Sequence, residues 1–154
     1  MNGDKKAMTL VSVLIGMFVT FSAPDIALSG MLTQAQQFSG LHEVKNNRKL
    51  RATLGINPAR TPWCGYFMGL VARKAGRKPP SRYTFARAWT TFGAPVSIDR
   101  ARPGDVVVIR TRRNYHVGIL SGLGKQWIRL LGGNQSGRVQ HSQFSRRSIV
   151  AIRR

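Results

Sequence analysis

The residue best suited to nucleophilic chemistry is Cys64, the only cysteine of the 154-residue chain. It follows the run Thr61-Pro62-Trp63 and opens a stretch whose apolar residues recur at helical spacing as far as Gly76. Backbone N–H groups and the positive end of the helix dipole would stabilise an anion at this position. The setting therefore predicts a thiol of lowered pKa, which favours the nucleophilic thiolate. The alternative is a small buried apolar residue with no chemical role.

A thiol nucleophile also needs a base, and the chain offers three histidines: His42, His116 and His141. His116 opens one apolar strand, and the next predicted strand ends in Gly-Gly-Asn134-Gln135. In an antiparallel hairpin the start of one strand lies near the end of the next, so Asn134 or Gln135 could orient the His116 ring. A thiol, an imidazole and an amide are the nucleophile, base and orienting group of acyl transfer. Ordinary packing and turn roles are the alternative for all of them.

The elements that would position these residues change along the chain from helices to strands. Thr61 is expected to cap the helix of Cys64, with Pro62 at its first position, and a second amphipathic helical piece is expected over 85–93. A short helix capped by Asn47 should end at Gly55. Strands are predicted over 105–109, 116–120, 127–131, 138–144 and 148–152. Helices followed by hairpin-linked strands predict an α+β fold with an antiparallel sheet.

The N-terminus has the pattern of an export signal. Lys5 and Lys6 precede an uncharged run from Ala7 to Ala23, which as a helix would be roughly 25 Å long, the lower limit for crossing a bilayer. Residues 1–25 are therefore predicted to be a cleaved signal peptide or an uncleaved membrane anchor, and a buried helix is the alternative. Residues 26–40 are expected to form a polar, weakly helical connector in which Leu32, Ala35 and Phe38 could share one apolar face. A single domain should follow over 41–154. This organisation predicts export to the periplasm or cell envelope.

The charge is strongly positive, with 25 Lys and Arg against 5 Asp and Glu, for a formal net charge of +20. Such an excess indicates a polyanionic partner, which could be nucleic acid, an anionic lipid surface or the bacterial cell wall. No aromatic-rich nucleic-acid motif is present, and an export signal fits poorly with nucleic acid as the partner. One cysteine and three scattered histidines lack metal-ligand spacing, so no metal or other cofactor is predicted.

Four motifs, read together and in order, resemble the CHAP and NlpC-type papain-like cysteine hydrolases of bacterial and phage cell-wall enzymes. The motifs are TPWCGYF (61–67), RPGDVVVI (102–109), HVGIL (116–120) and LLGGNQS (130–136). A softer match, GLHEVKNN (40–47), fits a Gly-x-x-Glu-x-x-x-Asn pattern upstream of the cysteine. The similarity runs from about Phe38 to Arg153 and is closest to a phage-associated subgroup with Pro-Trp-Cys and Gly-Gly-Asn-Gln motifs.

The resemblance implies a fold and a chemistry. The fold would be helices packed on a five-stranded antiparallel sheet, preceded by an apolar N-terminal helix. The chemistry would be hydrolysis of an amide bond in peptidoglycan through a thioester. By matched position, Cys64 would be the nucleophile, His116 the general base and then acid, and Asn134 the group that orients His116. Gln135 is the alternative for this third role.

The same resemblance suggests that Trp63, Tyr66 and Gln135 bind substrate, that Asp105 is structural and that His141 has no part. The family usually has two small residues after the cysteine, whereas this chain has Gly65-Tyr66. The leading hypothesis is a peptidoglycan hydrolase of phage lysis or envelope remodelling. The alternatives are a non-catalytic basic module that binds the wall or another polyanion, and an antibacterial amidase effector.

Overall fold

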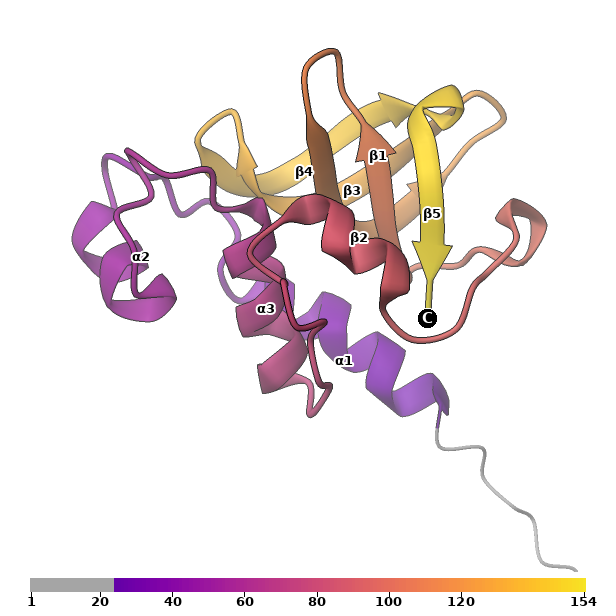
Figure 1. Cartoon of the computed structure of the whole chain (residues 1–154), viewed down its shortest axis with the longest axis horizontal. Helices are drawn as coiled ribbons and strands as arrows, with labels where there is room; N and C mark the ends of the chain where they lie inside the picture. The colour runs from indigo at the N-terminus through magenta and orange to yellow at the C-terminus, as the bar shows by residue number, and fades with distance from the viewer. Residues whose placement is uncertain (1–23) are drawn as a thin grey trace, which may run out of the picture.

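The computed structural model describes residues 24–154 (Figure 1). These residues form the helices α1 (Pro24–Gln36), α2 (Asn47–Leu54) and α3 (Cys64–Lys74) and the short 3₁₀ segments η1 (Ala86–Thr91), η2 (Ile98–Arg100) and η3 (Arg146–Ser148). The strands are β1 (Val106–Arg110), β2 (Tyr115–Leu123), β3 (Trp127–Gln135), β4 (Arg138–Ser145) and β5 (Ile149–Arg153). The predicted signal peptide or anchor lies outside this part of the chain, apart from its last two residues. No helix within 24–154 is long and apolar enough to span a membrane.

The five strands form one antiparallel sheet in the order β4-β3-β2-β1-β5. Neighbours along the chain pair as hairpins from β1 to β4, and β5 returns to the free side of β1. In the β1–β2 hairpin His116 lies opposite Ile109, so the predicted base sits at the start of β2, beside the turn that joins the two strands. The predicted α+β fold, with helices packed on a five-stranded antiparallel sheet, is confirmed.

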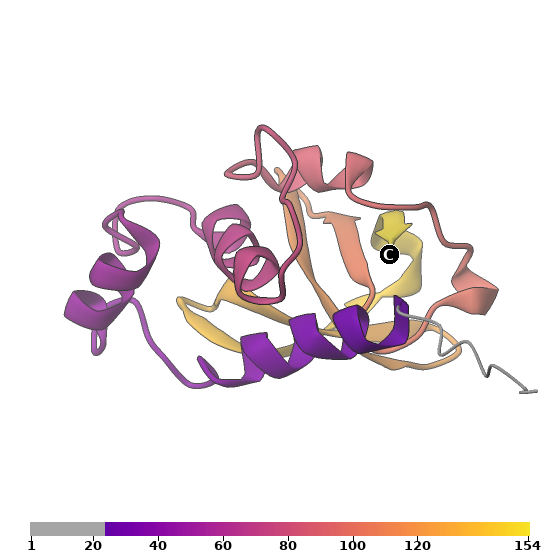
Figure 2. The ribbon, with the colours of Figure 1, turned by 90° about the horizontal axis from the view of Figure 1, so that it is seen from below.

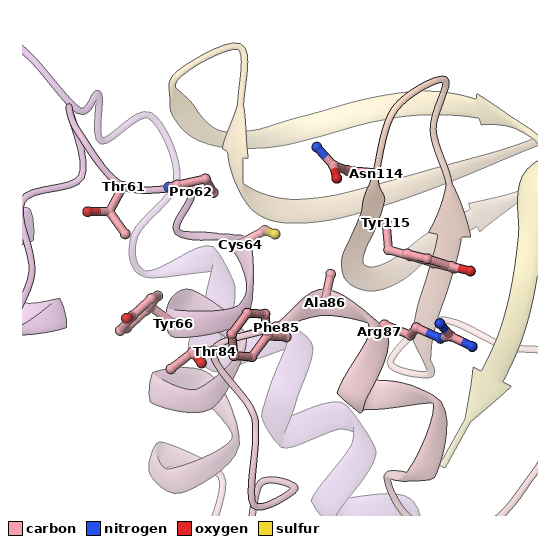
Figure 3. A pocket seen from close by; sticks show the side chains of 10 residues that line it. All are labelled: Thr61, Pro62, Cys64, Tyr66, Thr84, Phe85, Ala86, Arg87, Asn114 and Tyr115. Atoms are coloured by element: carbon pink, nitrogen blue, oxygen red, sulfur yellow. The ribbon is translucent and has the colours of Figure 1, made fainter.

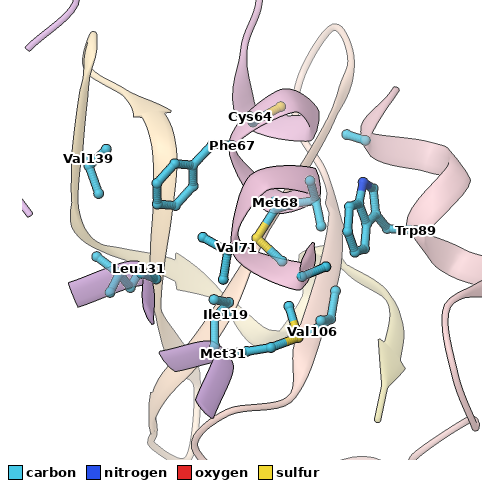
Figure 4. Close-up of a cluster of buried hydrophobic side chains, with 14 of the residues drawn as sticks. Met31, Cys64, Phe67, Met68, Val71, Trp89, Val106, Ile119, Leu131 and Val139 are labelled. Carbon is cyan, nitrogen blue, oxygen red and sulfur yellow. The ribbon is translucent and has the colours of Figure 1, made fainter. Parts of the chain in front are cut away.

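Both faces of the sheet are covered, which explains the nearly continuous apolar run of β1. Val106 and Val108 point to the face where α1 and α3 lie, while Val107 and Ile109 point to the other face. The helix side holds the larger core, in which α3 packs against β2 and β3 (Figures 2 and 4). Side chains from the segment 96–101, together with Phe144, pack against the second face.

The segment 26–40, expected to be a polar connector, is instead part of the packed domain. Helix α1 fills most of it, and Met31 and Ala35, one turn apart, are fully buried against α3 and the sheet. Phe38 follows the helix and meets the ring of Phe67 edge-on, with centroids 6.0 Å apart. Within residues 30–40 the buried Met31, Ala35 and Phe38 are separated by polar residues, most of them exposed, so this stretch has a polar composition although its inner side is buried.

The helix of Cys64 begins two residues later than predicted. Cys64 is the first residue of α3 and Trp63 occupies the capping position, with no side-chain cap, so the predicted cap at Thr61 is wrong. The predicted second helical piece, 85–93, forms the 3₁₀ segment η1. Gly55 does end α2, with a left-handed φ of 71° and its N–H donating to the carbonyl of Arg51, as expected.

Candidate active site

Cys64 is held at the start of α3 by a close crossing of the chain. The backbone of Tyr83 and Thr84 passes so near Gly65 that a Cβ atom on this residue would overlap the Thr84 carbonyl oxygen. One turn later, a Cβ atom on Gly69 would overlap the Tyr83 ring. Gly65 is therefore required sterically, which explains the first residue of the unusual Gly65-Tyr66 pair.

The thiol of Cys64 does not have the lowered pKa that the helix start predicts. The side chain is 8% exposed, and burial raises the pKa of the thiol because it disfavours the thiolate. Backbone hydrogen bonds from Val117, Gly65 and Cys64 itself oppose this rise in pKa but do not cancel it. The hydrogen bond from Val117 places the sulfur against β2, at the residue that follows His116.

The imidazole of His116 is also neutral at rest. Its ring packs against the Phe144 ring, with centroids 5.8 Å apart, and burial lowers the pKa of His116 to about 4. Its Nε2 atom is buried and has no hydrogen-bond partner within residues 24–154. A neutral imidazole at pH 7 can accept a proton, so the environment suits a general base.

Four predicted site residues come together at one hollow of about 500 Å³. Cys64 reaches it from α3, His116 from β2, and Asn134 and Gln135 from the end of β3. Acyl-transfer centres are recognised by this convergence of nucleophile, base and polar group from separate elements.

Of the two amides, Gln135 is the buried one. It is 5% exposed, and its Nε2 donates to the carbonyl oxygens of Leu130, Gly132 and Gln140, at 3.2 Å from the first and 3.1 Å from the second. Its Oε1 is buried and has no partner in the described chain. A Cβ atom placed on Gly132 would lie 3.1 Å from Nε2 of Gln135 and 3.4 Å from Nε2 of His116, so the two side chains share this space.

Asn134 plays a different part in the local backbone. It adopts a left-handed conformation, with φ of 61°, where β3 departs from regular pairing with β4. Asparagine tolerates this conformation better than most residues. Its side chain lines the same hollow but forms no hydrogen bond within the described chain.

A second hollow, of about 460 Å³, meets the first at the thiol (Figure 3). Both are lined by Pro62, Cys64, Asn114 and Tyr115, so together they form one groove that crosses the sulfur. Tyr66, Phe85 and Arg87 line only the second hollow. The Arg87 guanidinium lies 5.4 Å from the centre of the Tyr115 ring, and no acidic side chain of the described part lines either hollow.

One predicted substrate contact therefore needs correction. Trp63 is fully buried and donates from its indole N–H to Oε2 of Glu43 at 3.0 Å, so it cannot line a cleft. Gln135 lines the first hollow, and its Nε2 is bound to backbone carbonyl oxygens. Tyr66 does line the groove, as predicted. Glu43 was not foreseen as a partner of Trp63, although the Gly-x-x-Glu-x-x-x-Asn pattern marked its position.

The other polar candidates lie away from the groove. Nδ1 of His42 accepts from the backbone N–H of Val44, and Nδ1 of His141 lies 2.8 Å from Oγ of Ser121. Neither histidine lines either hollow. Asp105 is fully buried and its carboxylate is paired with Arg154 at 2.8 Å, which is a structural role, as expected.

Comparisons with known proteins bear on the fold. The P60 domain of antigen MAP1272c from M. avium paratuberculosis is 18% identical, with a TM-score of 0.56, over 83% of this chain and 92% of that chain. An NlpC/P60 family protein from Bacillus cereus is 14% identical, with a TM-score of 0.56, over 82% and 39% of the two chains. A variant of the resuscitation promoting factor interacting protein RipA is 15% identical, with a TM-score of 0.56, over 83% and 61%.

These likenesses define a class of fold. The chain has the papain-like α+β fold of NlpC/P60 domains. No protein-family profile and no curated protein sequence matches it.

The raised thiol pKa gives a prediction that can be checked without any substrate. We expect iodoacetamide to alkylate Cys64 about 10-fold more slowly in the folded protein than in urea at pH 8, because less thiolate is present. The rate should rise with pH to a midpoint above that of the unfolded chain. Mass spectrometry of the quenched reaction measures it, and a single cysteine makes the label unambiguous. A midpoint near or below pH 7 would mean that the thiolate is the resting state.

Proposed function

We propose that the protein is a cysteine hydrolase that cleaves an amide bond in the peptide part of peptidoglycan. The observation that carries this proposal is the single hollow lined by Cys64, His116 and a side-chain amide. The fold shared with NlpC/P60 domains supports it, as do the cell-wall hydrolase motifs of the sequence. The net charge of +20 suits an anionic wall, on which affinity should fall as salt rises.

The proposed mechanism starts from a neutral thiol and a neutral imidazole. The Cys64 sulfur attacks the amide carbonyl carbon while its proton passes to His116, so no thiolate accumulates beforehand. The backbone N–H of Cys64 and a nearby donor would stabilise the oxyanion. The His116 imidazolium then protonates the leaving amine, and a thioester is left on the sulfur. Water, deprotonated by His116, attacks the thioester carbon and the C–S bond breaks. The carboxylic acid is released, and the imidazolium returns the proton to the Cys64 sulfur.

The imidazolium in this sequence needs an acceptor for its second N–H group. Nε2 of His116 is the buried ring nitrogen, which leaves Nδ1 for the thiol side. We assign the acceptor role to Oε1 of Gln135, because this atom is buried and unpaired, and because the Gln135 amide and Nε2 of His116 both lie against Gly132. Such a hydrogen bond would stabilise the charged ring as the proton arrives. Asn134, the residue that the sequence pattern favours, is then a turn residue at the edge of the hollow.

Matched substitutions separate the two amides. Gln135→Met keeps the volume but removes the acceptor, and we expect kcat to fall by about 10- to 100-fold. Asn134→Gly suits the left-handed φ of 61°, and we expect kcat within about 3-fold of wild type. Steady-state kinetics, with thermal unfolding as a control for fold, measures both. The reverse ranking would return the orienting role to Asn134.

The groove has a direction under this mechanism. The leaving amine must lie where His116 can protonate it, in the first hollow. The acyl part of the substrate then lies in the second hollow, between the aromatic rings and Arg87. A guanidinium stacked on a ring and without an acidic partner in this hollow is suited to a carboxylate of an acidic stem peptide.

The cellular setting also belongs to the proposal. Residues 1–25, as a signal peptide or anchor, would deliver the domain to the periplasm or cell envelope. An uncleaved segment over 7–23 would hold it at the inner membrane, which fits a role in phage or prophage lysis. An antibacterial effector would use the same site.

Digestion of purified peptidoglycan tests the proposed function. Wild-type protein should release soluble fragments that carry one new amino group and one new carboxyl group per cut, which mass spectrometry identifies. New reducing sugar ends would contradict amide hydrolysis. Salt-sensitive binding to the wall without any release would instead support the alternative of a basic binding module on the same fold.

A further inference from the structure

Trp63, the residue before the nucleophile, has one polar atom, and its environment makes that atom important. The side chain is fully buried, and its indole N–H donates to Oε2 of Glu43 at 3.0 Å. A buried indole N–H without an acceptor would be costly. Glu43 therefore fixes the ring that immediately precedes Cys64, from a segment 20 residues earlier in the chain.

The Trp63 ring also touches the hairpin that carries the amides. A Cβ atom placed on Gly133 would lie 2.6 Å from Cζ3 of Trp63. The ring meets Phe67 of α3 edge-on, with centroids 6.3 Å apart. Trp63 thus packs between the first turn of α3 and Gly133 of β3. Its position therefore sets the distance between α3 and the end of β3, the two elements on either side of the hollow.

Glu43 also forms a backbone hydrogen bond with the same hairpin. Its backbone N–H donates to the carbonyl of Gly137 at 2.8 Å, and the N–H of Gly40 donates to Val139 at the same distance. Gly137 has a φ of 70°, and a Cβ atom there would lie 2.9 Å from Oε1 of Glu43. The Glu43 carboxylate therefore packs against Gly137 of the β3–β4 turn while it accepts the hydrogen bond from Trp63.

We propose that Glu43 is a positioning residue of the active site, which acts through Trp63 to hold Cys64 against the hairpin bearing Gln135. Glu43 does not line the groove, so this role differs from substrate binding. The kinetic part of the inference rests on the proposed hydrolase function. Its geometric part concerns the environment of the sulfur and can be tested on the thiol alone.

A double-mutant cycle tests the link between Glu43 and Trp63. Glu43→Ala should lower kcat by about 10- to 100-fold with KM within about 2-fold, because the reacting groups move apart while the groove persists. Glu43→Gln keeps an acceptor oxygen and should stay within about 3-fold of wild type. Trp63→Phe removes the donor and should cause a loss similar to that of Glu43→Ala. The double variant should lose no more than either single one.

Alkylation of Cys64 gives a readout that needs no activity. We expect the pH profile of iodoacetamide labelling to shift in Glu43→Ala and Trp63→Phe but not in Glu43→Gln. Asp99→Ala is the matched control, because it removes an exposed carboxylate in η2 and should leave kcat and labelling unchanged.

The outcomes distinguish the two proposals. A wild-type kcat and labelling profile in Glu43→Ala would overturn the positioning role, and additive losses in the double variant would show that Glu43 does not act through Trp63. If the wild type cleaves no peptidoglycan, the function fails while labelling still tests the geometry. If Glu43→Ala does not fold, Trp63→Phe decides, since a wild-type profile in that variant overturns the role.

Discussion

Cys64→Ala should abolish fragment release from peptidoglycan, with kcat lower by about 10⁴-fold or more, because it removes the only thiol of the chain. Alanine suits the start of α3, where Cys64 is small and 8% exposed, so the fold should persist. Release of soluble peptides, followed by turbidity and mass, measures the loss. Binding to the wall in low salt should be retained, since the charge is unchanged.

Cys64→Ser is the matched variant for this prediction. It keeps the shape and a hydroxyl, but a base as weak as His116 should not activate the hydroxyl, so this variant should also be inactive. Normal release by either variant would mean that the sulfur is a packing residue.

His116→Ala should lower kcat by about 10³-fold, because the thiol loses the base that accepts its proton. Since burial lowers the pKa of His116 to about 4, the base is neutral above that pH and becomes protonated below it. Wild-type kcat/KM should therefore hold as pH falls from 7 toward 5 and decline near pH 4. A pH series of initial rates with a short soluble stem peptide measures this limb.

His141→Ala is the control for that prediction. His141 contacts Ser121 outside the groove, so its removal should leave kcat and the acid limb unchanged. A decline of kcat/KM with a midpoint near pH 6.5 would show that the His116 ring is solvated in the free enzyme. Near-normal turnover of folded His116→Ala would exclude this residue from the mechanism.

Local pattern predicted the parts of the site that lie within one hairpin or one helix. The alternation of β2 and β3 and their short turn brought His116 to the Asn134-Gln135 end of the next strand. The helical spacing after Pro62 placed Cys64 at a helix start. These predictions succeed because antiparallel pairing and helix periodicity depend on neighbouring residues.

Contacts between distant segments were outside the reach of such patterns. Burial of Trp63 depends on Glu43 and Gly133, which approach it only in the folded sheet. The raised pKa of Cys64 has the same origin, because the helix start favours a thiolate but the surrounding core removes the water that would stabilise it. The proposed choice of Gln135 over Asn134 depends on which of the two side chains is buried, and adjacent amides in a sequence look equivalent.

The close crossing at Gly65 has a consequence for how the protein can diversify. The nucleophile helix is fixed against the backbone of Tyr83 and Thr84, whereas Tyr66, Phe85 and Arg87 project from the same two segments into the second hollow. Phe85 is 59% exposed, so its replacement costs little packing. Under the proposed function, the residues that line the second hollow can therefore be exchanged while the backbone that supports Cys64 stays constant. Selection for a different substrate would then act first on these three positions.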